Sequence, residues 1–260
     1  MQTTSPTSSF YRSFENAYDI FNTELFNNEL PPVLFTVTRK NNVMGYFMQN
    51  RWVSSENKLC SEIAVNPTFI GRSPLVEFFQ TLAHEMCHCW QHSKGTPSRT
   101  GYHNREWSDK MKMIGLIPST TGGPGGKDVG QKMNDYYDPN GKFIRVCMKL
   151  INDTFKIPWL DRHSKPANHY ASLGEDFQGI TLSDQPGDGP DSIQEIAALQ
   201  KLTEVANNLL PIEAFEVASL AKKKTKLKYM CPTCKVSVWG KASLNLRCDD
   251  CDQPMEAVGD

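Results

Sequence analysis

The segment from residue 73 to residue 90 most constrains the fold, because it combines helix signals with a His-Glu-x-x-His pattern. Ser73 is a suitable N-cap, Pro74 suits the first helical position, and Glu77 lies in the first turn. Apolar residues recur with a period of about 3.6: Leu75, Phe78, Phe79, Leu82, Ala83 and Met86. The sequence therefore predicts one amphipathic helix that carries the histidine pattern.

His84 and His88 are four positions apart, so a helix places both imidazoles on one face. Two such nitrogens can bind one Zn²⁺, and Glu85 then lies next to the water that the metal holds. The same pattern also arises by chance in amphipathic helices with two partly exposed histidines. The helix signals around it favour the metal site. These residue types indicate metal-assisted peptide hydrolysis, with Glu85 as the general base.

A catalytic zinc needs a third protein ligand and one open position. His103 follows a loop rich in Ser, Gly, Thr and Pro and precedes a second helical pattern at 104–116, so the chain can turn back toward the first helix. Glu106 in that second helix is the alternative. His92 is excluded, because eight residues of helix separate it from the first histidine by about 12 Å. We expect His103 as the third ligand, and Glu106 stays open.

The C-terminal region contains two C-x-x-C pairs, separated by thirteen residues: Cys231, Cys234, Cys248 and Cys251. Four thiolates with this spacing suit a tetrahedral structural zinc. Disulfides are the alternative, but the N-terminus lacks a secretory signal, so we expect a reducing compartment. A redox dithiol would need a thioredoxin-like β-α-β setting, which this region lacks. The spacing therefore predicts a zinc ribbon, and the chain is expected to bind one catalytic and one structural Zn²⁺.

Several motifs follow one another in the first half of the chain: Phe26-Asn27-Asn28-Glu29-Leu30-Pro31, Gly45-Tyr46-Phe47, Glu62-Ile63-Ala64-Val65-Asn66-Pro67, Thr81-Leu82-Ala83-His84-Glu85-Met86-Cys87-His88 and Tyr102-His103-Asn104-Arg105-Glu106-Trp107. Over about residues 10–118 their order and spacing resemble the SprT family, which includes the Spartan-type DNA-repair proteases. The family often has Gly and Phe where this chain has Asn104 and Trp107.

The resemblance has implications for the fold, the site and the substrates. It implies a zincin-like domain, His103 as the third ligand and a ribbon that follows the protease domain. It also implies that the substrates are proteins attached to DNA. The departures at Asn104 and Trp107 keep Glu106 open as a ligand.

Short β-like runs and helical patterns together predict an α+β fold, in which a small antiparallel sheet packs on helices. The runs cover 33–38, 43–48 and 60–65. The Gly-rich segment 120–130 lacks the preceding strand and the Ser/Thr of a phosphate loop, so no nucleotide site is predicted there. We predict three regions: a metalloprotease domain at 10–118, an extension and linker at 119–228, and the zinc ribbon at 229–258.

The net charge of the chain is −1, but residues 220–247 hold eight Lys and Arg and no Asp or Glu. A basic run beside aromatic residues suits phosphate contact and base stacking, and the alternative is a solvated linker. For Trp239 the alternative is packing in the ribbon core. The candidate nucleic-acid-binding residues are Lys222, Lys223, Lys224, Lys226, Lys228, Trp239 and Arg247. The expected partners are a protein substrate and DNA.

No apolar run approaches the roughly 20 residues that span a bilayer, and Met1–Ser9 has no signal-peptide core. We expect a cytoplasmic protein, associated with the nucleoid, or with the nucleus in a eukaryote, and not with a membrane. The principal hypothesis is a zinc-dependent endopeptidase that acts on DNA-bound proteins. The alternatives are a catalytically idle DNA-binding or transcription-associated protein, and a general peptidase whose ribbon is only structural.

Overall fold

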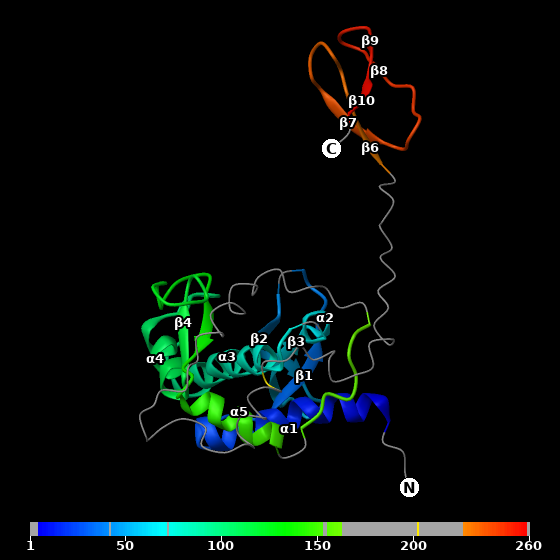
Figure 1. Cartoon of the computed structure of the whole chain (residues 1–260). Coiled ribbons are helices and arrows are strands. Elements are labelled where there is room, and N and C mark those ends of the chain that lie inside the picture. Colours follow the sequence, from blue (N-terminus) through cyan, green and yellow to red (C-terminus); the bar gives the residue numbers. More distant parts are fainter. Residues whose placement is uncertain are drawn as a thin grey trace. The chain divides into compact units, whose positions relative to one another are not determined.

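The computed structural model describes residues 5–41, 43–71, 73–152, 155–162, 202 and 226–258. The chain divides into two compact units, Met1–Glu216 and Val217–Asp260, which we describe separately (Figure 1). Each unit contains one of the two metal-ligand clusters that the sequence predicts. The finer division into 10–118, 119–228 and 229–258 stays a prediction.

Helix α1 (Pro6–Phe26) opens the first unit. The side chain of Ser5 caps its N-terminus by accepting a hydrogen bond from the Ser8 amide, and Pro6 occupies the first helical position, where no amide donor is needed. The helix ends at Asn27, which adopts a left-handed conformation with φ of 54°. The buried face is strongly aromatic, and it includes Phe14, Tyr18, Phe21 and Phe26. Helix α1 therefore supplies much of the core of this unit.

Three strands form the main sheet in the order β1-β3-β2: β1 (Val33–Val37), β2 (Gly45–Val53) and β3 (Leu59–Val65). Strands β2 and β3 pair antiparallel, whereas β1 and β3 pair parallel, with Phe35 opposite Ile63. The predicted α+β class is confirmed, but the sheet is mixed and not purely antiparallel. The chain passes from β1 to β2 at the opposite edge of the sheet and then returns to the centre as β3. Strand β3 therefore runs antiparallel to β2 and parallel to β1.

Helix α3 (Leu75–Lys94) follows the short helix α2 (Pro67–Ile70) and carries the histidine pattern. It contacts β2 and β3 of the sheet, and it also contacts α1 (Figure 1). The prediction that Ser73 is the N-cap is wrong. Pro74 occupies the cap in an extended conformation, and no side chain caps the helix. The helix begins one residue later because Pro74 keeps ψ at 143°, outside the helical range.

The chain then forms α4 (Arg105–Ile114), the antiparallel hairpin β4 (Leu116–Ser119) and β5 (Asn134–Tyr137), and α5 (Lys142–Asn152). The side chain of Asn104 caps α4 by accepting from the Trp107 amide, and Gly115 ends this helix with φ of 93°, a value that favours glycine. Helix α5 packs on α1, and β5 contacts α3. The hairpin and α5 thus extend the unit beyond the region at 10–118 that the sequence assigned to the protease.

The second unit contains a three-stranded antiparallel sheet of order β10-β6-β7 and a short ladder of β8 with β9. The strands are β6 (Leu227–Met230), β7 (Ser237–Gly240), β8 (Arg247–Cys248), β9 (Gln253–Pro254) and β10 (Glu256–Val258). Tyr229 is only 3% exposed, and its hydroxyl donates to the Lys241 carbonyl and accepts from the Leu244 amide. Across the described parts of both units, every helix is too short or too polar to cross a membrane.

Candidate metal centres

Helix α3 carries two of the three histidines that form the first cluster. His84 and His88 lie one turn apart, with ring centroids separated by 5.2 Å. His103 directly precedes α4, and its ring lies 5.3 Å from that of His84 and 4.9 Å from that of His88. One ring nitrogen from each residue can be chosen so that the three lie within 4.8 Å of one another. The structure thus brings together the three histidines that the sequence selects.

The spacing of these nitrogens fits a tetrahedral metal ion. The Nε2 atoms of His88 and His103 are 3.2 Å apart. Two nitrogens bound to one tetrahedral zinc at about 2.0–2.1 Å are separated by roughly 3.3 Å. Nδ1 of His103 lies 3.1 Å from the carbonyl oxygen of Gly130. A carbonyl only accepts hydrogen bonds, so the proton of the neutral ring is on Nδ1, and Nε2 keeps the lone pair that a metal requires.

Burial influences the protonation of all three imidazoles. Burial is the main cause that holds the pKa of His88 well below its usual value. The charges of His84 and His103 lower this pKa further. Burial first, and then His84, lowers the pKa of His103 to about 4. For His84 burial also acts downward, but the hydrogen bond that its ring donates to Asp135, together with the charges of Glu85 and Asp135, outweighs burial and raises the pKa. His88 and His103 are therefore neutral at pH 7, the state in which imidazole binds metals.

Glu85, the predicted general base, is 8% exposed and lies on α3 next to His84. Burial raises the pKa of its carboxyl, against the opposing effects of the His84 charge and of a hydrogen bond from the Phe47 backbone. Gly45 in β2 allows this close approach, because a Cβ at that position would lie 2.8 Å from Cγ2 of Thr81 and 3.7 Å from Cγ of Glu85. A strand without a side chain at Gly45 can therefore lie against the helix beside the base.

Glu106, the alternative third ligand, lies outside the histidine cluster. Its Oε2 atom accepts hydrogen bonds from Nε2 of Gln91 and from the backbone amide of Thr96, both at 2.7 Å. It therefore ties the start of α4 to the loop that follows α3. His92 also lies outside the cluster, and its ring is 6.1 Å from that of Phe47. Within the described residues, the histidine that completes the cluster is His103.

Sequence reasoning missed two partners of the histidines, both in the stretch between β4 and α5. Asp135 in β5 is 7% exposed, and its Oδ2 lies 2.9 Å from Nδ1 of His84. Its Oδ1 accepts a hydrogen bond of 3.1 Å from Nε2 of Gln80. Gly130, whose carbonyl faces His103, also pairs with it through backbone hydrogen bonds. Neither residue carries a local sequence signal, because both reach the site only through the folding of the hairpin.

The second cluster combines the four predicted cysteines, whose Sγ atoms lie within 4.8 Å of one another. The Sγ atoms of Cys234 and Cys248 are 3.6 Å apart, close to the roughly 3.8 Å expected for two thiolates on one tetrahedral zinc. Backbone hydrogen bonds, from Cys234 first and also from Thr233, lower the pKa of the Cys231 thiol to about 6. These amides stabilise a thiolate, which is the form that binds a metal. The donor set therefore fits a four-cysteine zinc site.

The surface of the second unit presents part of the predicted nucleic-acid-binding set. Trp239 is 65% exposed, and Nζ of Lys228 lies 5.7 Å from the centre of its ring. Tyr229, and not Trp239, is the aromatic residue that packs inside this unit. Arg247 is exposed and forms an ion pair of 2.7 Å with Asp252. Lys226 is exposed, whereas Lys222, Lys223 and Lys224 lie outside the described residues.

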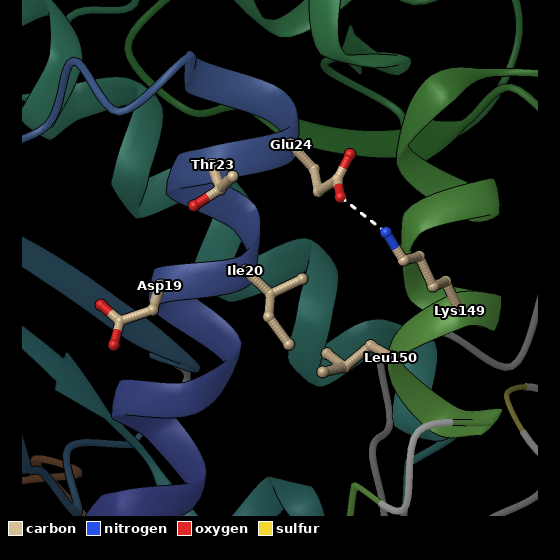
Figure 2. A pocket seen from close by; sticks show the side chains of 6 residues that line it. All are labelled: Asp19, Ile20, Thr23, Glu24, Lys149 and Leu150. Carbon is tan, nitrogen blue, oxygen red and sulfur yellow. Dashed lines mark hydrogen bonds and ion pairs between the residues drawn. The ribbon is translucent and has the colours of Figure 1, made fainter.

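A pocket of about 320 Å³ lies between α1 and α5 (Figure 2). An ion pair of 2.7 Å between Glu24 and Lys149 crosses it. Its lining residues are Asp19, Ile20, Thr23, Glu24, Lys149 and Leu150, and none belongs to either metal-ligand cluster. The candidate metal ligands therefore do not line this pocket.

Comparisons with known proteins give one family match and one similar protein. Residues 14–122 match the model of the SprT-like family. A segment of 52 residues, 20% of this chain, is 44% identical to a Salmonella typhimurium protein described as "Uncharacterized protein in mucB 3'region" and covers 70% of that protein. No solved structure matches the chain. The family match includes all three clustered histidines and Glu85, and it ends before Gly130 and Asp135.

Proposed function

The chain belongs to the SprT-like family, and on that premise we propose that it is a zinc-dependent endopeptidase. One observation carries the proposal: His84, His88 and His103 direct ligand nitrogens at one point, beside a buried carboxylate that is not itself a member of the cluster. Zinc with three protein ligands and an open position is the arrangement of catalytic sites. A purely structural site would use all four positions.

A zinc ion at this site supplies Lewis acidity, which lowers the pKa of water toward about 7 and polarises a peptide carbonyl. The proposed role of Glu85 is to take the proton from that water and to pass it to the departing amine. The raised pKa of its buried carboxyl suits this role, because a base that is too acidic would not hold the proton between the two steps. His84, His88 and His103 would hold the metal through their ring nitrogens, each in the neutral form that binds metals.

The test compares full-length wild-type protein with Glu85→Gln on an unfolded protein substrate, with the zinc content of both measured. Glu85→Gln should keep its zinc and lose cleavage, since the base is removed and every ligand stays. Glu77→Gln is a matched control, because it changes another buried glutamate of α3 and should keep activity. Cleavage by Glu85→Gln at the wild-type rate would contradict the proposal. A wild-type protein that binds zinc but never cleaves would favour the idle-protein alternative.

We further propose that the preferred substrates are proteins bound to DNA. The exposed Trp239 ring, with Lys228 above it, provides a surface that suits stacking on an unpaired base beside a phosphate. In the sequence, Lys222, Lys223 and Lys224 precede β6 and add positive charge without acidic residues.

Cleavage of a DNA-binding protein should therefore be measured without DNA, with single-stranded DNA and with duplex DNA. DNA should accelerate cleavage by wild-type protein. Exchange of Lys222, Lys223 and Lys224 for Glu should reduce the acceleration and the salt dependence of DNA binding, by roughly 0.7 to 0.9 in slope for each lost phosphate contact. Equal rates with and without DNA, in wild-type protein and in this variant, would support the general peptidase instead.

A further inference from the structure

The stretch from Gly130 to Asp135 contacts two of the three clustered histidines on the side away from the proposed metal. Asp135 Oδ2 lies 2.9 Å from Nδ1 of His84, and the Gly130 carbonyl oxygen lies 3.1 Å from Nδ1 of His103. In both rings the contacted atom is Nδ1, which leaves Nε2 to face the shared point. Both partners lie beyond residues 14–122, the part of the chain that matches the family model.

Two backbone hydrogen bonds hold Gly130 at His103. The His103 amide donates to the Gly130 carbonyl at 2.8 Å, and the Gly130 amide donates to the His103 carbonyl at 3.0 Å. The same Gly130 oxygen thus accepts from the amide and from the ring of one residue. This arrangement sets the orientation of the His103 ring relative to its own backbone.

Asp135 is held from a second direction. Nε2 of Gln80 donates to Oδ1 of Asp135 at 3.1 Å, and Gln80 lies one turn before His84 on α3. The two carboxylate oxygens therefore accept from two successive turns of the same helix. Strand β5 holds the residue in place by its pairing with β4, where Asp135 lies opposite Pro118. Because Asp135 is 7% exposed, an ionised carboxylate there needs strong hydrogen-bond donors.

We propose that the β4–β5 hairpin is a positioning element for the metal site, in which Asp135 orients His84 and the Gly130 carbonyl orients His103. The inference rests on the proposed zinc function and extends it to residues outside the family match. Partners of this kind fix the ring tautomer and increase the basicity of the ligand nitrogen. Asp135 is a positioning residue and not a catalytic one, because it acts on the site only through His84.

Asp135→Asn separates positioning from packing, because asparagine has nearly the same shape. His84 and Gln80 bond to different oxygens of the Asp135 carboxylate, and asparagine keeps an oxygen at only one of these two positions, so one of the two hydrogen bonds loses its acceptor. If the amide NH₂ faces His84, Nδ1 must become the acceptor and the ring proton moves to Nε2, which then cannot bind metal. A merely structural role would leave zinc affinity unchanged in this variant.

The experiment is an equilibrium competition for Zn²⁺ between full-length apoprotein and a chromophoric chelator. His103→Ala serves as the reference in which the histidine site is lost and the cysteine site remains. Asp135→Asn should bind zinc at the histidine site about 10- to 100-fold more weakly than wild-type protein, with little change in thermal unfolding in the presence of a strong chelator. The matched control is Asp138→Asn, which removes a carboxylate from the turn after β5 and should keep wild-type affinity.

Wild-type zinc affinity in a folded Asp135→Asn variant would overturn the inference and leave the proposed function intact. An equal loss in Asp138→Asn would also overturn it, because the effect would then be one of net charge. If wild-type protein takes up no more zinc than His103→Ala, the proposed function and this inference fail together. If Asp135→Asn does not fold, Gln80→Met provides the test. This variant removes the hydrogen bond from Gln80 to Asp135 and should weaken zinc binding by a smaller factor. An unchanged zinc affinity in Gln80→Met would then overturn the inference.

Discussion

The ring of Trp107 stacks on the ring of His88, with centroids 5.1 Å apart and planes inclined by 21°. The same indole contacts the edges of His84 and His103, at 4.8 Å and 4.4 Å between centroids. Trp107 is fully buried, and its ring packs against all three imidazoles. One residue of α4 therefore connects the hydrophobic core to the proposed metal site.

Replacing Trp107 should affect stability and zinc binding together. Trp107→Ala should lower the free energy of unfolding by about 3–5 kcal/mol, because it leaves a large cavity. Trp107→Phe should cost much less, since the indole Nε1 has no hydrogen-bond partner among the described residues and its loss leaves no partner unsatisfied. Urea unfolding of both variants, with zinc and with a chelator, measures the effect. A Trp107→Ala protein as stable as wild type would contradict the role of the indole in the core.

The third ligand can be assigned by a pair of variants. His103→Ala should lose the zinc of the histidine site, because two imidazoles remain where three met. Glu106→Gln should keep this zinc, since its carboxylate bonds to Gln91 and Thr96 instead. Zinc content per chain, measured by atomic emission, distinguishes the two. Retention in His103→Ala together with loss in Glu106→Gln would make Glu106 the ligand.

The cysteine site should behave as an independent folding unit. Exchange of Cys231 and Cys234 for Ser should release one zinc per chain and unfold the second unit, because small zinc modules fold only with metal. The first unit should keep its own zinc and its fold. The matched control is Cys60→Ser, which changes a cysteine outside the cluster and should release no zinc. Release of both zinc ions by the double variant would refute the independence of the two sites.

Trp239 and Tyr229 should have opposite effects on the ribbon. Trp239→Ala removes an exposed ring, so it should leave the unit folded and weaken single-stranded DNA binding by about 1–3 kcal/mol, more than it weakens duplex binding. Tyr229→Ala removes a buried ring and two hydrogen bonds, so it should destabilise the unit and reduce binding of both DNAs alike. Fluorescence anisotropy with labelled oligonucleotides gives both affinities. An unchanged affinity in Trp239→Ala would exclude base stacking by this ring.

Glu77 should make stability depend on pH. Burial raises the pKa of its carboxyl from 4.5 to about 7, so folding favours the protonated form. Below about pH 4.5 the residue is protonated in both states and has no net effect. As pH rises to about 7, the unfolded chain loses this proton first and the folded state is progressively disfavoured. Above pH 7 the residue reduces stability by about 3 kcal/mol at most.

Glu77→Gln should therefore stabilise the protein at pH 8 and change little at pH 4. Urea unfolding at both pH values provides the measurement. Glu56→Gln is the control, because the Glu56 side chain is 70% exposed and should show no such pH-dependent gain. The same change in stability at both pH values would mean that the Glu77 carboxyl does not titrate as its burial implies.

From the sequence alone, His84 with His88 and the two C-x-x-C pairs could be selected as candidate metal ligands, because the geometry within each pair is local. His84 and His88 lie four residues apart on one helix, so they share a face. The two cysteines of each C-x-x-C pair are brought close by one tight turn. The buried aromatic residues of α1, among them Phe14 and Phe21, lie at helical spacing, so local conformation places them on one face. These features require only the conformation of a few consecutive residues, which local side chains decide.

The tertiary structure decided the features that depend on how distant segments meet. Sequence left His103 and Glu106 as alternatives, and the path of the loop between α3 and α4 places only His103 beside the other histidines. The crossing of β2 made the sheet mixed. Asp135 reaches His84 across 51 positions of sequence, and no local pattern marks it. Such contacts arise from the packing of whole helices and strands. The local sequence around each of the two residues therefore does not predict them.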